Sequence, residues 1–433
     1  MISLFFLLHG LTSTIAALRD ATLLSLGGGI GALPWISVAS AVLGLCVLNP
    51  WAAVARSSVS SLRTLLRCTA VMLAMFAAAY AAGGVDQRTV GALCAVLDNV
   101  CVLASSLLWM SARTTTSAAA NHFVAYATAC SAGKATGLAV AWALGHALQV
   151  AAAPIGPGAL TAAVCALFAF AALILEATRH LLWRVAEGAP RRARRGSPRS
   201  HSACAATALT STSAFALTLG LFSLSYAFNA GVLRAEKLAL VGRVGHARIE
   251  GGLPAPPLGD SALLLRSFAS LVRINLWSAA ATLAVQLALA RSARAALDVP
   301  ALLMVLPSID VGYAVWRLWR GAGGVGASAN AARLATIATL ESVRSVVAYA
   351  FLKAAREELY IALPPRCARR TKIYAGEAAR RLAGPAAALL AGGDVAVLAA
   401  TCGGWLVCAA TGTQFAWRRS VMRRVAQGGE VRI

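Results

Sequence analysis

Four long intervals of this sequence contain no charged residue, and they constrain the fold more than any other feature. They lie between Asp20 and Arg56, between Lys134 and Glu176, between Arg199 and Arg234, and between Asp394 and Arg418. A helix that crosses a bilayer needs about 20 mostly apolar residues, so each of the first three intervals can hold at least one such helix. The composition agrees, because 59% of the 433 residues are hydrophobic and only 13% are charged. The sequence therefore predicts an all-α integral membrane protein and excludes a large soluble enzyme.

The pattern of apolar runs predicts about 12 transmembrane helices. We expect them near residues 2–20, 33–54, 66–84, 90–110, 123–148, 158–183, 206–230, 264–290, 297–318, 332–352, 383–393 (extended at either end) and 395–417. We expect an N-terminal six-helix half (1–183), a basic disordered cytoplasmic loop (184–205), a C-terminal six-helix half (206–417) and a basic cytoplasmic tail (418–433). This layout is typical of a major-facilitator-like membrane transporter.

The net charge of +23 comes almost entirely from arginines that cluster between the apolar runs. Basic loops stay on the cytoplasmic side of a membrane, so we expect both termini to face the cytoplasm or its equivalent. Arginines in such places favour contact with anionic membrane lipids and not with nucleic acid. The ten cysteines form no Cys-x-x-Cys pair, and no metal-ligand cluster or nucleophile–base arrangement is evident. We therefore expect neither a metal nor a cofactor, and no enzymatic activity.

Three stretches carry a family resemblance. Residues 17–36 read ALRDATLLSLGGGIGALPWI, with an Arg-Asp pair, a Gly-rich turn and Leu-Pro-Trp. Residues 98–110 read DNVCVLASSLLWM, and residues 349–387 contain an Arg-Glu pair, a Tyr, Leu-Pro and a later Lys. In these stretches the chain resembles the nucleotide transporter (ATP/ADP translocase) family of plastids and intracellular parasites, with its bacterial relatives.

The resemblance implies a secondary transporter that exchanges ATP for ADP by alternating access. Five positions match functional positions of the family, and Arg273 in the eighth span would add a further cation. The candidate substrate-binding residues are therefore Arg19, Asp20, Lys237, Arg273, Arg356 and Glu357. A guanidinium can hold phosphate oxygens through two hydrogen bonds. The alternative is that Arg19–Asp20 and Arg356–Glu357 only flank helices at the membrane surface. The resemblance leaves the membrane open, a plastid or another intracellular membrane included.

Two departures from the family pattern favour other functions. Residues 114–121 lack the family's acidic cluster, and the eighth span carries Arg266 and Arg273 where relatives have acidic or amide side chains. A second hypothesis is therefore a transporter of another organic anion or solute on the same scaffold, coupled to protons through Asp20 or Asp98. A third is a transport-inactive membrane scaffold whose basic loop binds anionic lipids.

Ionisable residues inside spans usually face the interior of a helix bundle. The candidates for coupling or gating are Asp98, Lys134, Glu341 and Arg344. Because Glu341 and Arg344 are three residues apart, they share a helix face. We expect an ion pair between them, either a structural pair within the helix or one that lines a cavity.

Overall fold

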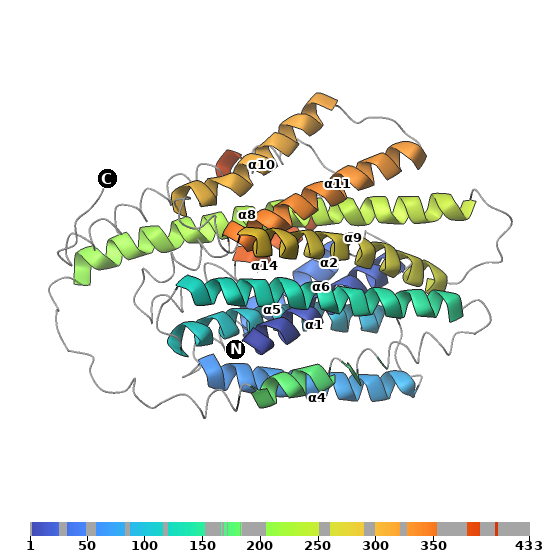
Figure 1. Cartoon of the computed structure of the whole chain (residues 1–433), viewed down its shortest axis with the longest axis horizontal. Coiled ribbons are helices and arrows are strands. Elements are labelled where there is room, and N and C mark those ends of the chain that lie inside the picture. Colours follow the sequence, from blue (N-terminus) through green and yellow to red (C-terminus); the bar gives the residue numbers. More distant parts are fainter. Residues whose placement is uncertain are drawn as a thin grey trace.

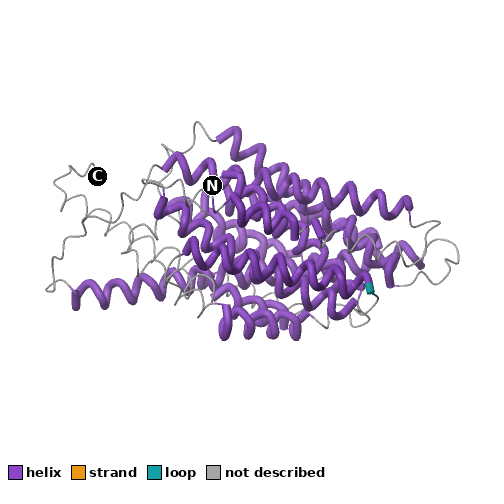
Figure 2. The backbone as a smooth tube through the Cα atoms, turned by 90° about the horizontal axis from the view of Figure 1, so that it is seen from below, coloured by secondary structure: helices purple, strands orange, loops and turns teal. Residues whose placement is uncertain are grey.

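The computed structural model describes twelve parts of the chain. They are residues 2–25, 33–48, 58–82, 87–115, 120–151, 172–181 with residues 166, 169, 170 and 183, 205–250, 260–289, 299–320, 327–352, 379–389 and 403–405. The elements in these parts are helices, and Figures 1 and 2 show that they run roughly along one common axis. The first group, which we call the N-terminal group, contains α1 (Ile2–Ser25), α2 (Leu33–Leu43) with η2 (Gly44–Leu48), α4 (Ser58–Ala81), α5 (Gln87–Thr115) and α6 (Ala120–Ala151). The C-terminal group contains α8 (Ala205–Glu250), α9 (Asp260–Leu289), α10 (Val299–Arg320), α11 (Ala327–Val347) with η4 (Ala348–Leu352), and α14 (Ala379–Leu389).

Seven helices, α1, α5, α6, α9, α10, α11 and α14, begin and end within five residues of the predicted spans. The segment α2 with η2 ends at Leu48, six residues before the predicted end at 54, and the bounds of α4 and α8 differ more. α4 begins at Ser58, eight residues before the expected start at 66, so Arg63 lies inside a helix and its guanidinium lies 4.0 Å from the centre of the Trp183 ring. The physical reason is that an arginine at a helix end extends its charged tip while its stem stays in apolar surroundings. Hydropathy therefore underestimates the length of a helix that begins with arginines.

α8 is the larger discrepancy. It was expected to end near residue 230 but continues to Glu250, giving a helix of 46 residues. The continuation carries Arg234, Glu236 and Lys237, whose charges ended the apolar run in the sequence. These side chains all have partners on other helices. Tertiary pairing therefore extends the helix beyond the limit that hydropathy predicts.

α1 lies at the centre of the bundle, where it packs against α5, α6 and α9. Its apolar side chains are buried on several sides, as expected for a helix without a polar face. It approaches α6 closely at three glycines: a Cβ added at Gly10 would lie 3.0 Å from the Gly133 carbonyl oxygen, and one at Gly137 would overlap the Gly10 backbone. Thr14 Oγ1 also donates a hydrogen bond of 3.1 Å to the Gly137 carbonyl. Gly133 and Gly137 therefore allow the two helices to pack closely.

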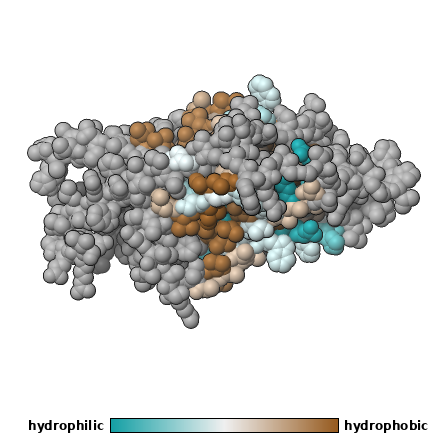
Figure 3. All heavy atoms as spheres, turned by 90° about the horizontal axis from the view of Figure 1, so that it is seen from above, coloured by the Kyte–Doolittle hydropathy of each residue, from teal (hydrophilic) through white to brown (hydrophobic). Residues whose placement is uncertain are grey.

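Among the described residues, three helices are long and apolar enough to cross a membrane: Ile2–Ala21, Ser61–Ala79 and Ser267–Ala288. Large apolar side chains lie exposed on the outside of the bundle, among them Trp35 at 76% and Trp277 at 72% exposure. Figure 3 shows apolar side chains exposed over the middle of one face. Such a surface suits contact with lipid tails rather than water.

The two groups of helices pack directly against each other. α6 and α1 lie along α9, and α2 lies against α14. Within the C-terminal group, α8 packs on α14 and α11, and α11 packs on α9. Side chains on α1, α6, α8 and α9 can therefore meet between the groups. The predicted loop 184–205 lies outside the described residues except for Ala205, where α8 begins, and the tail 418–433 lies outside them entirely. The domain limits and the sidedness of the termini therefore stay predictions.

Candidate functional site

The charged pair at the end of the first predicted span lies inside the bundle. Arg19 and Asp20 on α1 are only 8% and 5% exposed. Arg19 Nε donates a hydrogen bond to Asp20 Oδ1 at 3.0 Å, and Arg19 Nη1 donates to Asp98 Oδ2 on α5. Burial of a charge is costly unless it is paired and hydrogen-bonded. The two carboxylates therefore allow an arginine to occupy the centre of the bundle.

A second arginine reaches the same carboxylate from the other group of helices. Arg234 on α8 donates from Nε to Asp20 Oδ2 at 3.1 Å and from Nη2 to Asp20 Oδ1. This two-pronged geometry is the strongest form of arginine–carboxylate pairing. Asp20 thus connects α1 of the N-terminal group to α8 of the C-terminal group.

Lys237 lies one helical turn beyond Arg234 on α8 and is 2% exposed. Its Nζ donates hydrogen bonds to Asn275 Oδ1 at 3.1 Å and to Glu341 Oε1 at 2.9 Å. It also lies close enough to Asp20 to interact with it electrostatically. Helices α1, α8, α9 and α11 are therefore joined through one continuous set of charges.

Lys134 on α6 adds a second lysine to this set. Its Nζ lies 5.4 Å from the centre of the Tyr349 ring. Glu341 attracts the ammonium and Lys237 repels it. We call the whole set the central charge cluster, and it consists of Arg19, Asp20, Asp98, Lys134, Arg234, Lys237 and Glu341.

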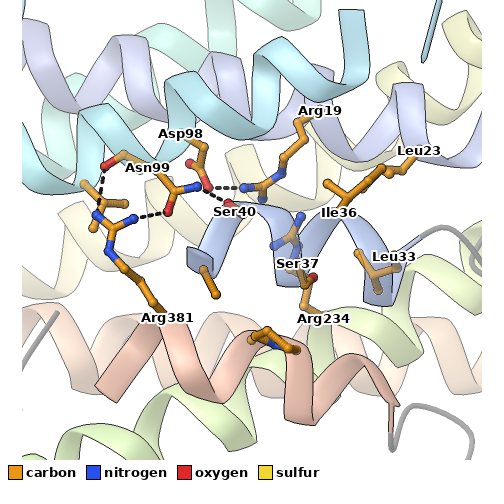
Figure 4. A pocket seen from close by; sticks show the side chains of 14 residues that line it. Arg19, Leu23, Leu33, Ile36, Ser37, Ser40, Asp98, Asn99, Arg234 and Arg381 are labelled. Atoms are coloured by element: carbon orange, nitrogen blue, oxygen red, sulfur yellow. Dashed lines mark hydrogen bonds and ion pairs between the residues drawn. The ribbon is translucent and has the colours of Figure 1, made fainter. Parts of the chain in front are cut away.

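A cavity of about 210 Å³ opens beside this cluster. Figure 4 shows Arg19, Asp98 and Arg234 at its wall, together with Arg381 from α14. Arg381 Nη1 donates to Asn99 Oδ1 at 2.5 Å, and the Asn99 amide donates in turn to the Ser40 hydroxyl. The remaining wall is largely apolar: Leu23, Leu33, Ile36, Ala41, Val102 and Pro385.

The cluster and the cavity carry excess positive charge. The cluster holds four cations and three carboxylates, and Arg381 adds a fifth cation, so five positive and three negative charges leave a net charge of two. In an apolar interior such an excess favours the entry of an anion. The arrangement is therefore suited to bind a small anion.

The structure brings most of the predicted site residues together. Arg19, Asp20 and Lys237, from the substrate-binding set, and Asp98, Lys134 and Glu341, from the coupling or gating set, all belong to the central charge cluster. Arg273 on α9 is exposed and makes no ion pair with the described residues. Arg356 and Glu357 lie outside the described residues.

The predicted Glu341–Arg344 pair is wrong. Glu341 binds Lys237 on α8, whereas Arg344 Nη1 donates to Asp310 Oδ1 on α10 at 2.5 Å. Both side chains leave α11 from neighbouring positions, but their long stems reach partners on different helices. Arg344 and Asp310 therefore form a separate buried pair, with side chains 7% and 2% exposed.

The sequence reasoning missed Arg234 and Arg381. A usable signal existed for Arg234, because it precedes Lys237 by three residues and so shares its helix face. Arg381 precedes the predicted span at 383–393 by two residues, yet it lies in α14 and is 7% exposed. Gly44 leaves room for the Arg381 side chain, because a Cβ added at Gly44 would overlap it.

The sequence matches no known protein-family model and no curated protein. Its fold is similar to that of major facilitator superfamily transporters. A bacterial homologue of the iron transporter ferroportin, outward-facing with soaked iron, is 12% identical with a TM-score of 0.54 over 97% of this chain and 99% of that chain. The transporter FucP in its outward conformation is 12% identical with a TM-score of 0.51, over 96% of this chain and 98% of that chain. A double-Trp mutant of XylE is 13% identical with a TM-score of 0.51, over 96% of this chain and 95% of that chain.

Identities this low show the fold alone. The chain has the major-facilitator fold along nearly its whole length, and the predicted multi-pass, all-helical membrane architecture is confirmed. The resemblance to the nucleotide translocase family is not confirmed by these comparisons.

Proposed function

We propose that this protein is a secondary transporter that moves a small organic anion across a membrane by alternating access. The observation that carries the proposal is the net positive charge of the central charge cluster and its cavity, buried between two groups of helices. In folds of this class, substrates bind near the bilayer midplane between the two halves, which then rock about the site. The anion would bind where both groups of helices contribute cations.

Arg19 and Arg234 would hold the anion. In the structure both guanidiniums bind Asp20, and Arg19 also binds Asp98. An anion that enters the cavity would take over some of these hydrogen bonds, so that binding exchanges an internal carboxylate for a substrate oxygen. Such an exchange avoids leaving a guanidinium buried without a partner at any stage.

Exchange of ATP for ADP is the specific form that the family resemblance implies. In its favour, Arg19, Asp20 and Lys237 lie together in the cluster. Against it, the cavity volume of about 210 Å³ is below the ~300–1,000 Å³ of sites for drug-sized ligands. The cavity suits a carboxylate or phosphate group better than a whole nucleotide, and an organic anion smaller than ATP is therefore the stronger candidate.

Uptake into liposomes that contain the purified full-length protein tests these forms. Labelled ATP is offered with and without internal ADP, followed by a panel of labelled organic anions with and without a pH gradient. ATP uptake that requires internal ADP would establish exchange, and anion uptake that requires the pH gradient would establish proton coupling. Correctly inserted protein with no flux of any anion would contradict the proposal and favour a scaffold that binds anionic lipids.

The variant Arg19→Gln links the flux to the cluster. Because a hydrogen bond from a charged donor is worth about 1.5–3 kcal/mol, its half-saturation constant should rise at least about 10-fold. Arg243→Gln is the matched control, since it removes the same charge from an exposed position on α8. Equal uptake by Arg19→Gln, Arg243→Gln and the unchanged protein would remove Arg19 from the site.

A further inference from the structure

Lys134 has a cationic group that the anion site around Arg19 does not use. It lies on α6, next to the glycine contact with α1, and its side chain is partly buried. Among the described residues its ammonium has neither a hydrogen-bond nor an ion-pair partner, and it lies 5.4 Å from the centre of the Tyr349 ring. An aromatic face attracts a cation but does not neutralise its charge.

Among the described residues, Glu341 is the carboxylate that acts on Lys134, and it already forms an ion pair with Lys237. Glu341 Oε2 lies 2.7 Å from Lys237 Nζ, and Lys237 is more deeply buried than Glu341, with side chains 2% and 31% exposed. Two ammonium groups, one from each group of helices, therefore share a single carboxylate. Lys134, Lys237 and Glu341 together therefore carry one excess positive charge. This charge is additional to the excess positive charge of the residues around the cavity.

The two ends of the cluster lie close to each other. Arg234 and Lys237 are three residues apart on α8, which corresponds to a rise of about 4.5 Å along the helix. Two anionic groups a few bonds apart in one small molecule can span such a separation. One group would bind Arg19 and Arg234, and the other would bind Lys134 and Lys237.

We propose that Lys134 forms a second anion subsite with Lys237, so that the transported solute is a small molecule with two anionic groups. The inference rests on the proposed transport function and narrows its substrate class. Dicarboxylates and diphosphates share the required chemistry, and the experiment below separates them.

The test measures anion binding to the purified full-length protein by the shift of its unfolding temperature, since a ligand that binds the folded state raises that temperature. Two matched pairs of probes are titrated at pH 7 and constant ionic strength: butyrate against succinate, and phosphate against pyrophosphate. In each pair the carbon or phosphorus chemistry is kept while the number of anionic groups changes. We expect at least one doubly anionic probe to bind about 10-fold more tightly than its partner.

Three variants locate the preference. Lys134→Gln should lower the affinity for the probe with two anionic groups about 10-fold and that for the probe with one anionic group by much less, so that the preference is lost. Lys134→Arg keeps the charge and should retain the preference, which also shows that the position tolerates substitution. Arg243→Gln should bind as the unchanged protein does. Tighter succinate binding assigns the site to dicarboxylates, and tighter pyrophosphate binding assigns it to phosphates.

Equal affinities within both pairs would overturn the second subsite, as would an unchanged preference in Lys134→Gln. Either result leaves the anion transport proposal standing if singly anionic probes bind and are taken up. Absence of binding and of uptake for every probe would instead refute the transport function itself. The failures of the two proposals are thus distinguishable.

Discussion

Replacing Arg344 by leucine should lower the free energy of unfolding by about 3–5 kcal/mol, the range measured when one partner of a buried ion pair is removed. Asp310 is the partner that would be left, with its side chain only 2% exposed. Its Oδ2 already lacks a hydrogen-bond partner among the described residues, and its Oδ1 is bound by Arg344. The substitution would therefore leave a buried carboxylate with no compensating cation.

The double variant Arg344→Leu with Asp310→Leu should recover most of this loss. When both members of a buried pair become apolar, stability is typically unchanged or improved. The coupling energy from the double-mutant cycle should thus be at least about 2 kcal/mol. Unfolding by denaturing detergent in mixed micelles, followed through the fluorescence of the ten tryptophans, gives the free energies by linear extrapolation.

Two results would contradict the reasoning. A loss below about 1 kcal/mol in the single variant would mean that the pair behaves like an exposed one. A double variant as unstable as the single one would mean that Arg344 stabilises the protein through packing and not by neutralising Asp310. Asp310→Leu alone checks the opposite half of the cycle, since it leaves a buried arginine.

Two further predictions concern the helix contact and the charge cluster. Gly137→Leu should prevent folding, because the leucine side chain would overlap the Gly10 backbone. Size-exclusion chromatography should then show aggregated protein. The control variant Gly312→Leu should elute normally, because a Cβ at Gly312 meets nothing within 4 Å. Asp98→Asn should lower the half-saturation constant for anion uptake by about 3- to 10-fold, because it removes a carboxylate that competes for Arg19 and raises the positive charge of the site. An unchanged or higher constant in the uptake assay would mean that Asp98 does not compete with the substrate.

The sequence was sufficient to predict the helices and the fold class. Apolar runs between charges located α1, α5, α6, α9, α10, α11 and α14 within five residues, because membrane helices must satisfy their backbone internally and lie in an apolar medium. Hydropathy predicts the wrong helix end where charged residues lie inside the helix. α4 was expected to start too late and α8 to end too early, since arginines and lysines with partners or with access to the membrane surface do not end a helix.

The site could be predicted only in part. Ionisable residues inside spans identified Arg19, Asp98 and Lys134, because a charge in a membrane interior requires a functional or structural reason. Their partners could not be predicted, since pairing depends on which helices become neighbours. Glu341 illustrates the difference: its position on the helix favoured Arg344, yet the packing of α8 against α11 gave it Lys237.

The length of α8 has a mechanical consequence. At a rise of 1.5 Å per residue, its 46 residues extend about 69 Å. Tilted by about 20°, they still cover about 65 Å, compared with about 40–45 Å for a bilayer with its headgroups. Figure 1 shows α8 as the longest rod in the bundle. Because Arg234 and Lys237 lie on this rod, a reorientation of the charges inside the membrane would also move its ends in the surrounding water. A fluorophore attached near either end of α8 would then report the movement of the helix during each transport cycle from outside the bilayer.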